Sequence, residues 1–400
     1  MKSLLRVLPL GAGLLAACHS DTKTSQSATT AATPPATTAP ATPALADTPG
    51  AYYRQYRGLL PGTADTITLN LTVAPRRNGD TNLAGSFGSY HGPDGHPYQL
   101  ASRPTQAPDS VLLFDVSPEK AANDLESASW RLRRQGAELT GTYNGQPLRL
   151  HEVRPAGSLV LFVRYYADST VAFPGVAKSP VSHLSLQALL PTAAPPALTE
   201  NIMRDLRGDT LPNLPVPQLA QFWAKQRAEY QKSYREDAEE NRKGLDGTED
   251  ELPTLYGLSY ESQQSTFVLW NQGSLLSLGF YDYSYTGGAH GNYGTKAVTY
   301  DTRTGQRLRY TDIFRPGVEA QLSQLLDQAV RRTLRMAPTQ PLAENLFVKE
   351  MPVTHNVYLT SGGVVFVYLP YEIASYAQGE VPVFVPMAEL QPLLKQQPAS

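Results

Sequence analysis

Cysteine is almost absent from this chain, since Cys18 is the only one in 400 residues. A single cysteine excludes an internal disulfide and any site built from several thiolates. Charge is also sparse: charged residues make up 18% of the sequence, and the formal net charge at pH 7 is −2. A slightly acidic balance attracts neither nucleic acid nor an anionic membrane surface, so we expect neither as a partner.

Familiar catalytic motifs and membrane-length apolar runs are missing as well. The sequence has no Gly-x-Ser-x-Gly elbow, phosphate-binding loop, His-Glu-x-x-His pair or dinucleotide fingerprint. No stretch after residue 18 approaches the ~20 apolar residues that a membrane-spanning helix needs. With 30 glycines and 33 prolines, the composition favours a loop-rich and strand-rich protein over a helical bundle. We therefore expect a protein that is not an enzyme and that carries no metal or other cofactor.

The N-terminus has the pattern of a secretory leader. Lys2 and Arg6 accompany a mostly apolar run over residues 4–15, and Leu-Ala-Ala-Cys18 follows. Small residues at such a junction mark a cleavage site. The tetrapeptide resembles the bacterial lipobox, which implies that residues 1–17 are removed and that Cys18 is lipidated. The alternative is an ordinary leader with a cysteine at the junction. We expect a periplasmic, outer-membrane or cell-surface protein, anchored to a bacterial membrane by lipid alone.

A segment of low complexity follows the cysteine. From residue 19 to residue 50, 25 of 32 residues are Ser, Thr, Ala or Pro. Such a composition has almost nothing with which to build a core, and its prolines favour extended conformations. We predict that residues 18–50 form a disordered tether.

Residues 51–155 have the pattern of an all-β domain. Ile67–Val73 alternates between apolar and polar residues, and Asp94-Gly95 and Asn144-Gly145 supply the positive φ values of tight hairpins. Seven or eight short strands predict an antiparallel meander or a small barrel. Leu139–Tyr143 resembles a strand of small ligand-binding barrels such as avidin. This suggests one alternative function, a small-molecule carrier with a cavity in this domain.

Residues 156–400 have the pattern of an α+β domain with an antiparallel sheet and packed helices. Apolar residues recur at helical spacing over residues 217–243 and again over residues 318–334. Leu275–Tyr285 is strand-like and follows a Gln272-Gly273 turn. The predicted fold class of the whole chain is therefore α+β, with two domains after the tether.

A glycine-rich cluster around His290 is the main candidate site. Its glycines permit positive φ and a close approach of the backbone, which would present His290 as a ligand contact or metal ligand. Alternatively, the glycines shape a tight connection, and His290 hydrogen-bonds a neighbouring carbonyl. Tyr281, Tyr283 and Tyr285 alternate onto one face, as an aromatic binding surface or as simple sheet packing. The residues that we predict to contact a partner are Tyr285, Gly287, Gly288, His290, Asn292 and Tyr293.

Several motifs in the C-terminal half occur in order at plausible spacing. Leu278–Gly291 is followed by Tyr300–Gly305 and Tyr310–Phe314, and Val367–Gly379 lies near the end. This succession resembles the extracytoplasmic domain-of-unknown-function family 3298 (DUF3298). The region from Val181 to about residue 250 is similar to the companion half that usually precedes it. The family's domain occurs in lysozyme-sensing anti-sigma factors, beside peptidoglycan deacetylase domains and in lipoproteins without known activity.

The resemblance implies a binding module near the cell wall. This sequence shows no cytoplasmic anti-sigma segment and no Asp/His run of a metal-dependent polysaccharide deacetylase, so neither activity carries over. The leading hypothesis is a noncatalytic envelope lipoprotein that binds a lysozyme-like muramidase or peptidoglycan through the region of His290. The alternatives are the small-molecule carrier and an envelope hydrolase whose catalytic residues are distant from one another in sequence.

Overall fold

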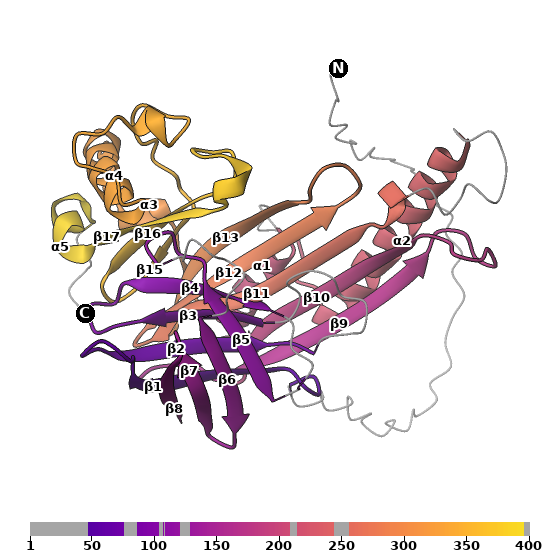
Figure 1. Cartoon of the computed structure of the whole chain (residues 1–400), viewed down its shortest axis with the longest axis horizontal. Helices are drawn as coiled ribbons and strands as arrows, with labels where there is room; N and C mark the ends of the chain where they lie inside the picture. The colour runs from indigo at the N-terminus through magenta and orange to yellow at the C-terminus, as the bar shows by residue number, and fades with distance from the viewer. Residues whose placement is uncertain are drawn as a thin grey trace, which may run out of the picture. The chain divides into compact units, whose positions relative to one another are not determined.

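The computed structural model describes residues 47–75, 86–103, 107, 109–120, 129–208, 214–243 and 256–395. The chain from Leu45 onward forms one compact unit. Its described residues build a closed barrel, a six-stranded sheet and a three-stranded sheet with helices (Figure 1). This arrangement confirms the predicted α+β fold class. The predicted leader, Cys18 and the tether up to residue 46 lie outside the described residues.

The N-terminal strands form an eight-stranded antiparallel barrel. Each strand pairs with the next, and β1 closes the ring by pairing with β8, where Gln55 lies opposite Val153. Of the two predicted forms, the closed barrel is therefore the one that the chain adopts. The strands are β1 (Tyr52–Leu59), β2 (Thr66–Val73), β3 (Ser86–His91), β4 (Pro97–Arg103), β5 (Ser110–Asp115), β6 (Trp130–Gln135), β7 (Glu138–Tyr143) and β8 (Gln146–Val153).

Large side chains fill the interior of the barrel. Tyr56, Tyr90 and Trp130 are fully buried there among leucines from most of the strands. Alternation along each strand sends these residues inward, as expected for a small barrel whose core is packed. The described part of the barrel thus offers no support for the carrier hypothesis.

A long six-stranded sheet follows the barrel in the order β14-β13-β12-β11-β10-β9. Neighbouring strands are antiparallel except β10 and β11, which run parallel. The predicted strand Leu275–Tyr285 is confirmed as β12. The other strands are β9 (Leu161–Val171), β10 (Val181–Pro191), β11 (Glu261–Gln272), β13 (Asn292–Asp301) and β14 (Arg307–Leu308).

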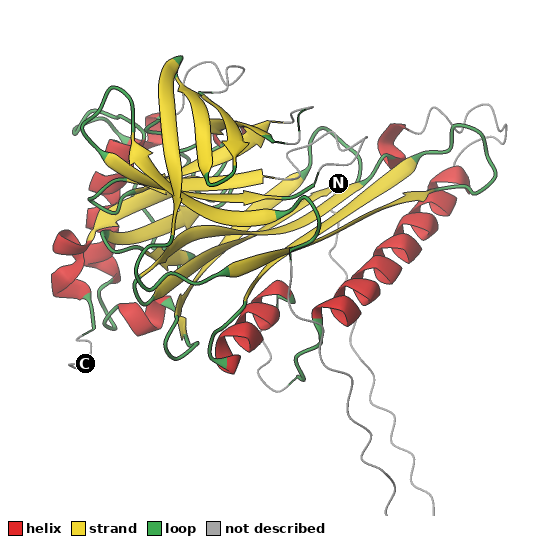
Figure 2. Cartoon of the chain, turned by 90° about the horizontal axis from the view of Figure 1, so that it is seen from below, coloured by secondary structure: helices red, strands yellow, loops and turns green. Residues whose placement is uncertain are grey.

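Two helices cover one face of this sheet, α1 (Pro196–Leu206) and α2 (Leu219–Lys243) (Figure 2). Leu198 and Ile202 of α1 are buried in one core with Leu278 and Phe280 of β12. Burial of this apolar stripe, rather than helix propensity, stabilises a helix of such length. No helix in the described ranges is long and apolar enough to cross a membrane.

The last part of the chain packs a small antiparallel sheet against helices. Leu322, Leu326 and Val330 of α4 share a core with Val364 and Phe366 of the sheet. The strands are β15 (Val357–Leu359), β16 (Gly363–Tyr368) and β17 (Val381–Pro386). The α-helices are α3 (Tyr310–Ile313), α4 (Glu319–Thr333) and α5 (Met387–Leu390). Single 3₁₀ turns occupy Tyr256–Leu258, Leu342–Glu344, Tyr376–Gln378 and Gln391–Leu393.

Two buried hydrogen bonds connect the barrel to the long sheet. The side-chain amide of Gln55 donates to the carbonyl of Asn271 at 2.9 Å. The hydroxyl of Ser89 donates to the carbonyl of Val268, also at 2.9 Å. Because buried polar groups must be hydrogen-bonded, these bonds fix β3 and the neighbouring β1 and β2 beside β11. Their alignment creates one wall of the cleft described below.

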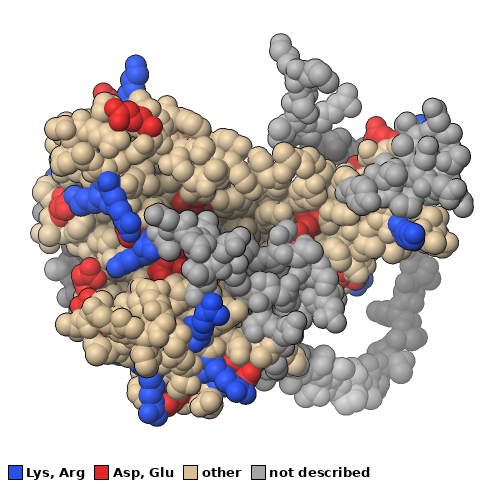
Figure 3. Space-filling model, viewed as in Figure 1, with Lys and Arg blue, Asp and Glu red and all other residues tan. Residues whose placement is uncertain are grey.

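Charge is scattered over the face seen in Figure 3. Lys and Arg side chains there lie among Asp and Glu, and most of the visible described surface is uncharged. A phosphate-binding surface would gather basic side chains on one face. This face does not show such a patch.

Candidate functional site

A cleft of about 990 Å³ opens between the barrel and the long sheet. The barrel contributes side chains from β3, β4 and β5, and the sheet contributes β11, β12 and the start of β13. A segment from Tyr376 to Pro382 adds a third wall. Three of the predicted site residues, Tyr285, His290 and Tyr293, line this cleft together.

The other predicted site residues do not line it. Gly287 and Gly288 have φ values of 91° and 95°, so they shape the connection between β12 and β13. A Cβ at Gly287 would lie 2.9 Å from the carbonyl oxygen of Gly257. The hydroxyl of Tyr285 donates to the carbonyl of Gly288 at 3.0 Å and ties this loop to its strand. Asn292 lines a separate groove at the edge of β13.

Seven aromatic rings follow one another in space, and we call them the aromatic ladder; six of them line the cleft, and the last lies just outside it. In order they are Phe267, Phe87, Tyr281, Tyr293, Tyr376, His290 and Tyr371. Successive ring centroids lie 4.7, 5.6, 6.0, 5.5, 3.8 and 6.4 Å apart. These separations fall within or near the range in which aromatic side chains attract one another. The ladder runs from the contact with the barrel to an exposed outer end.

His290 stands at that outer end. Its Nδ1 lies 3.0 Å from the carbonyl of Gly291, so it is the protonated nitrogen, and Nε2 is left to accept from the Tyr371 hydroxyl at 3.3 Å. The ring stacks on Tyr376, whose hydroxyl donates to the same carbonyl at 2.7 Å. His290 thus makes the carbonyl hydrogen bond of the simpler sequence interpretation and also forms part of the cleft wall.

Tyr371 has a strained backbone. Its φ is +71°, a left-handed value that bulky residues rarely adopt. Its side chain is 56% exposed, so burial does not compensate for the strain. Strain of this kind persists where the surroundings over-determine a conformation, and it concentrates at functional sites.

Replacing Tyr371 with glycine is expected to raise the free energy of unfolding by about 0.5–1 kcal/mol, because glycine adopts positive φ without a steric penalty. The same change removes the outermost ring of the ladder and should weaken ligand binding at the cleft. Chemical denaturation measures the first effect. A glycine variant less stable than the parent would show that Tyr371 contributes contacts worth more than its strain.

Glu380 adds a partly buried carboxyl group to the cleft wall. One carboxylate oxygen accepts a hydrogen bond from the backbone N–H of Thr295. Burial raises the pKa of Glu380 to about 7, and the charge of Glu372 acts in the same direction. The nearby titratable side chains from β12 and β13 are Tyr281 and Tyr293; both are neutral at this pH, and burial raises each pKa further above the ordinary tyrosine value. Glu380 therefore changes its charge close to neutral pH.

The Glu380→Gln variant should reveal this ionisation in its stability. A carboxyl whose pKa rises from 4.5 to about 7 on folding costs nothing below pH 4.5 and costs progressively more up to pH 7. Glutamine still accepts the Thr295 hydrogen bond and has no charge to bury. We expect the variant to exceed the parent by up to about 3 kcal/mol at pH 8 and to match it at pH 4. Equal stability curves at both pH values would contradict the buried carboxylate.

Sequence reasoning missed Tyr371, Tyr376 and Glu380. The first two lie within the run Val367–Gly379, which carries part of the family resemblance but no strand or helix periodicity. Only the fold brings this run beside the loop of His290. Among the described residues, no group of three or more His, Cys, Asp or Glu side chains could hold a metal.

Two protein-family models match the C-terminal part of the chain. One, described as deacetylase PdaC, matches residues 193–293, and one, described as a protein of unknown function (DUF3298), matches residues 311–388. Tyr281, His290 and Tyr293 lie in the first segment, and Tyr371 and Tyr376 lie in the second. The ladder is thus assembled from both matched segments and completed by Phe87 of the barrel. No curated protein matches the chain.

Two solved structures are also similar to this chain. A crystal structure of a DUF3298 family member from Bacteroides fragilis matches with 22% identity and a TM-score of 0.53, over 61% of this chain and 97% of that one. A DUF3298 family protein from Pseudomonas aeruginosa matches with 20% identity and a TM-score of 0.40, over 59% of this chain and 95% of that one. At this identity, the likeness to the Bacteroides protein shows a shared fold. The C-terminal part of this chain therefore has a segment that matches the PdaC model, followed by one that matches the DUF3298 model.

Proposed function

We propose that this protein is a noncatalytic, lipid-anchored envelope protein whose aromatic cleft binds peptidoglycan. The observation that carries the proposal is the aromatic ladder, which lines a concave site with rings from three parts of the fold. Sugar rings present flat C–H faces that pack on aromatic rings, and tyrosine adds a hydroxyl at the edge of that contact. Pockets that combine apolar walls with a few placed polar groups are the usual binding sites.

The shape of the site favours a chain-like ligand over a folded muramidase. A stable protein–protein interface buries roughly 800 Å² on each partner, usually across a broad surface. Here the rings lie along the wall of a groove, where a glycan strand can follow them in succession. Of the two partners implied by the family resemblance, peptidoglycan is the better match to this geometry.

Polar groups in the cleft suit the acetamido groups of a cell-wall glycan. Glu380, when protonated, donates a hydrogen bond to a carbonyl oxygen, whereas its carboxylate form only accepts. Gln263 and Gln378 also line the cleft and supply both donors and acceptors. Binding should therefore be stronger below pH 7 than above it if an acetamido carbonyl meets Glu380.

The test is a titration of the purified protein with soluble peptidoglycan fragments, together with sedimentation of the protein with insoluble peptidoglycan. We expect saturable binding that survives moderate salt, because stacking on aromatic rings does not depend on screened surface charge. A lysozyme is titrated in parallel at the same salt. Binding of lysozyme without binding of peptidoglycan would replace this proposal with the muramidase alternative, and binding of neither would remove the function from the cleft.

A further inference from the structure

A second pocket, of about 600 Å³, lies on the helix-covered side of the long sheet. Gln264 and Thr266 of β11, Asp282 of β12 and Lys296 of β13 line it, and the start of α2 closes it. In the sheet register, Gln264 lies opposite Asp282. Alternation along β12 places the side chain of Asp282 on the face opposite to Tyr281 and the ladder. The two sites therefore open on opposite faces of the sheet, and Tyr281 is the residue that lines both.

Two buried oxygen atoms in this pocket have no hydrogen-bond partner. They are Oγ1 of Thr266, a residue with 0% exposure, and Oε1 of Gln226 from α2. The amide nitrogen of Gln226 donates to Gln264, which fixes the side chain and leaves its oxygen without a donor. Both residues line the pocket. Buried polar atoms are almost always paired, so unpaired ones beside an open volume indicate a missing donor.

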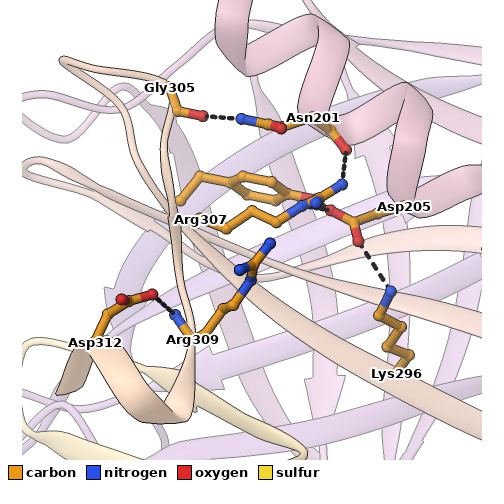
Figure 4. A network of polar contacts seen from close by, with 8 residues as sticks. Asn201, Asp205, Lys296, Gly305, Arg307, Arg309 and Asp312 are labelled. Carbon is orange, nitrogen blue, oxygen red and sulfur yellow. Dashed lines mark hydrogen bonds and ion pairs between the residues drawn. The ribbon is translucent and has the colours of Figure 1, made fainter. Parts of the chain in front are cut away.

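The charges of the pocket also favour a donor. Lys296 pairs with Asp205 at 2.9 Å, as Figure 4 shows, and Lys225 pairs with Glu229 at 3.7 Å. Arg207 also lines the pocket, and it donates to the carbonyl of Pro215 at 2.7 Å. Asp282 has no cation within ion-pair distance among the residues that the structure describes, although the more distant charge of Lys296 acts on it. Neighbouring elements partly desolvate the Asp282 carboxyl and raise its pKa above the usual range, although the side chain is exposed at the mouth of the pocket. A ligand cation beside Asp282 would supply the counter-charge that this carboxylate lacks.

We propose that this pocket binds a small organic amine whose ammonium group pairs with Asp282. Further N–H or O–H groups of the ligand donate to Oε1 of Gln226 and to Oγ1 of Thr266. Phe222 and Phe280 supply apolar walls for the carbon skeleton. The ligand class is therefore a protonated amine with neighbouring hydroxyl or amide donors, such as an amino sugar with a free amino group. This site is independent of the proposed function of the aromatic cleft.

The first test uses the unaltered protein. Glucosamine, N-acetylglucosamine and glucose are titrated at pH 6.5 while the side-chain amide signals of glutamine are followed by nuclear magnetic resonance. We expect glucosamine alone to give saturable shifts that include Gln226 and Gln264. Equal responses to all three sugars, or none to glucosamine, would overturn the proposal without any variant.

The second test compares matched variants. Asp282→Asn keeps the shape of the side chain and should weaken glucosamine binding at least tenfold, and Thr266→Val should weaken it several-fold. Asp301→Asn removes a carboxylate from the end of the same sheet, outside the pocket, and should bind as the parent does. Peptidoglycan binding is measured on each variant, so failure at the cleft and failure at this pocket are distinguished. Unchanged glucosamine binding by a folded Asp282→Asn variant would also overturn the proposal.

Discussion

Replacing Asp205 with alanine is expected to lower the free energy of unfolding by about 3–5 kcal/mol, because it breaks a buried charge network. The Asp205 carboxylate lies between α1 and the sheet and is 5% exposed. It accepts from Lys296 at 2.9 Å, from the Tyr300 hydroxyl at 2.7 Å and from Arg307 at 2.7 Å (Figure 4). Without this carboxylate, the hydroxyl of Tyr300 and the guanidinium of Arg307 lose the acceptor of these hydrogen bonds in a buried environment.

Urea denaturation followed by circular dichroism measures this loss. The matched control is Glu138→Ala, which removes a carboxylate of the barrel that pairs with Arg149 at 2.6 Å on the surface. Exposed pairs contribute about 0–1 kcal/mol, so this variant should stay close to the parent. Similar losses for the two variants would show that Asp205 does not join α1 to the sheet as the geometry indicates.

Replacing Tyr376 with alanine is expected to weaken binding of peptidoglycan fragments about tenfold, because it removes the ring of the aromatic ladder that lies between Tyr293 and His290. Tyr376 stacks on His290 with ring centroids 3.8 Å apart and meets Tyr293 edge-on at 5.5 Å. A lost aromatic contact of ~1–1.5 kcal/mol corresponds to roughly a tenfold change in affinity. Calorimetric titration of the variant and the parent at one salt concentration measures it.

Two comparisons make this result specific to the cleft. Tyr376→Phe keeps the ring but loses the hydroxyl that donates to Gly291, so most of the affinity should be retained. Tyr166→Ala removes a tyrosine of β9 that does not line the cleft, and it should bind as the parent does. If the alanine variants at positions 376 and 166 lose equal affinity, the ladder is not the binding surface.

Local patterns predicted most elements of this fold, and the differences have physical causes. β11 begins at Glu261, five residues before its apolar part starts at Thr266. Residues 261–265 are polar, and they are strand because they pair in register with Tyr281–Tyr285. β14 is short, Arg307–Leu308, since Tyr310 already belongs to α3. The ends of these strands are decided by pairing with other strands and by the start of the next helix, and the alternation of apolar and polar residues does not reveal either.

The candidate site divides in the same way. Glycines and tyrosines around His290 were visible as a cluster, and the structure brings Tyr285, His290 and Tyr293 to one cleft. The sequence did not reveal that Tyr376 and Glu380 complete this cleft, that Tyr371 extends the ladder beyond it or that Phe87 of the barrel reaches it. Nor did the sequence indicate the pocket behind the sheet. Gln226, Gln264 and Asp282 belong to three different elements, and within each element a polar residue is expected to face solvent.

The sequence by itself determined where most of the described strands and helices form: strands follow from alternation and helices from apolar stripes. These properties are local, since they depend on neighbours within a few positions. Only the tertiary structure decided that the meander closes into a filled barrel, that β10 and β11 pair in parallel and that rings from three regions form one ladder. Those outcomes depend on contacts between residues far apart in the chain. Such contacts form because the apolar surfaces of distant segments are buried against one another, which no local pattern shows.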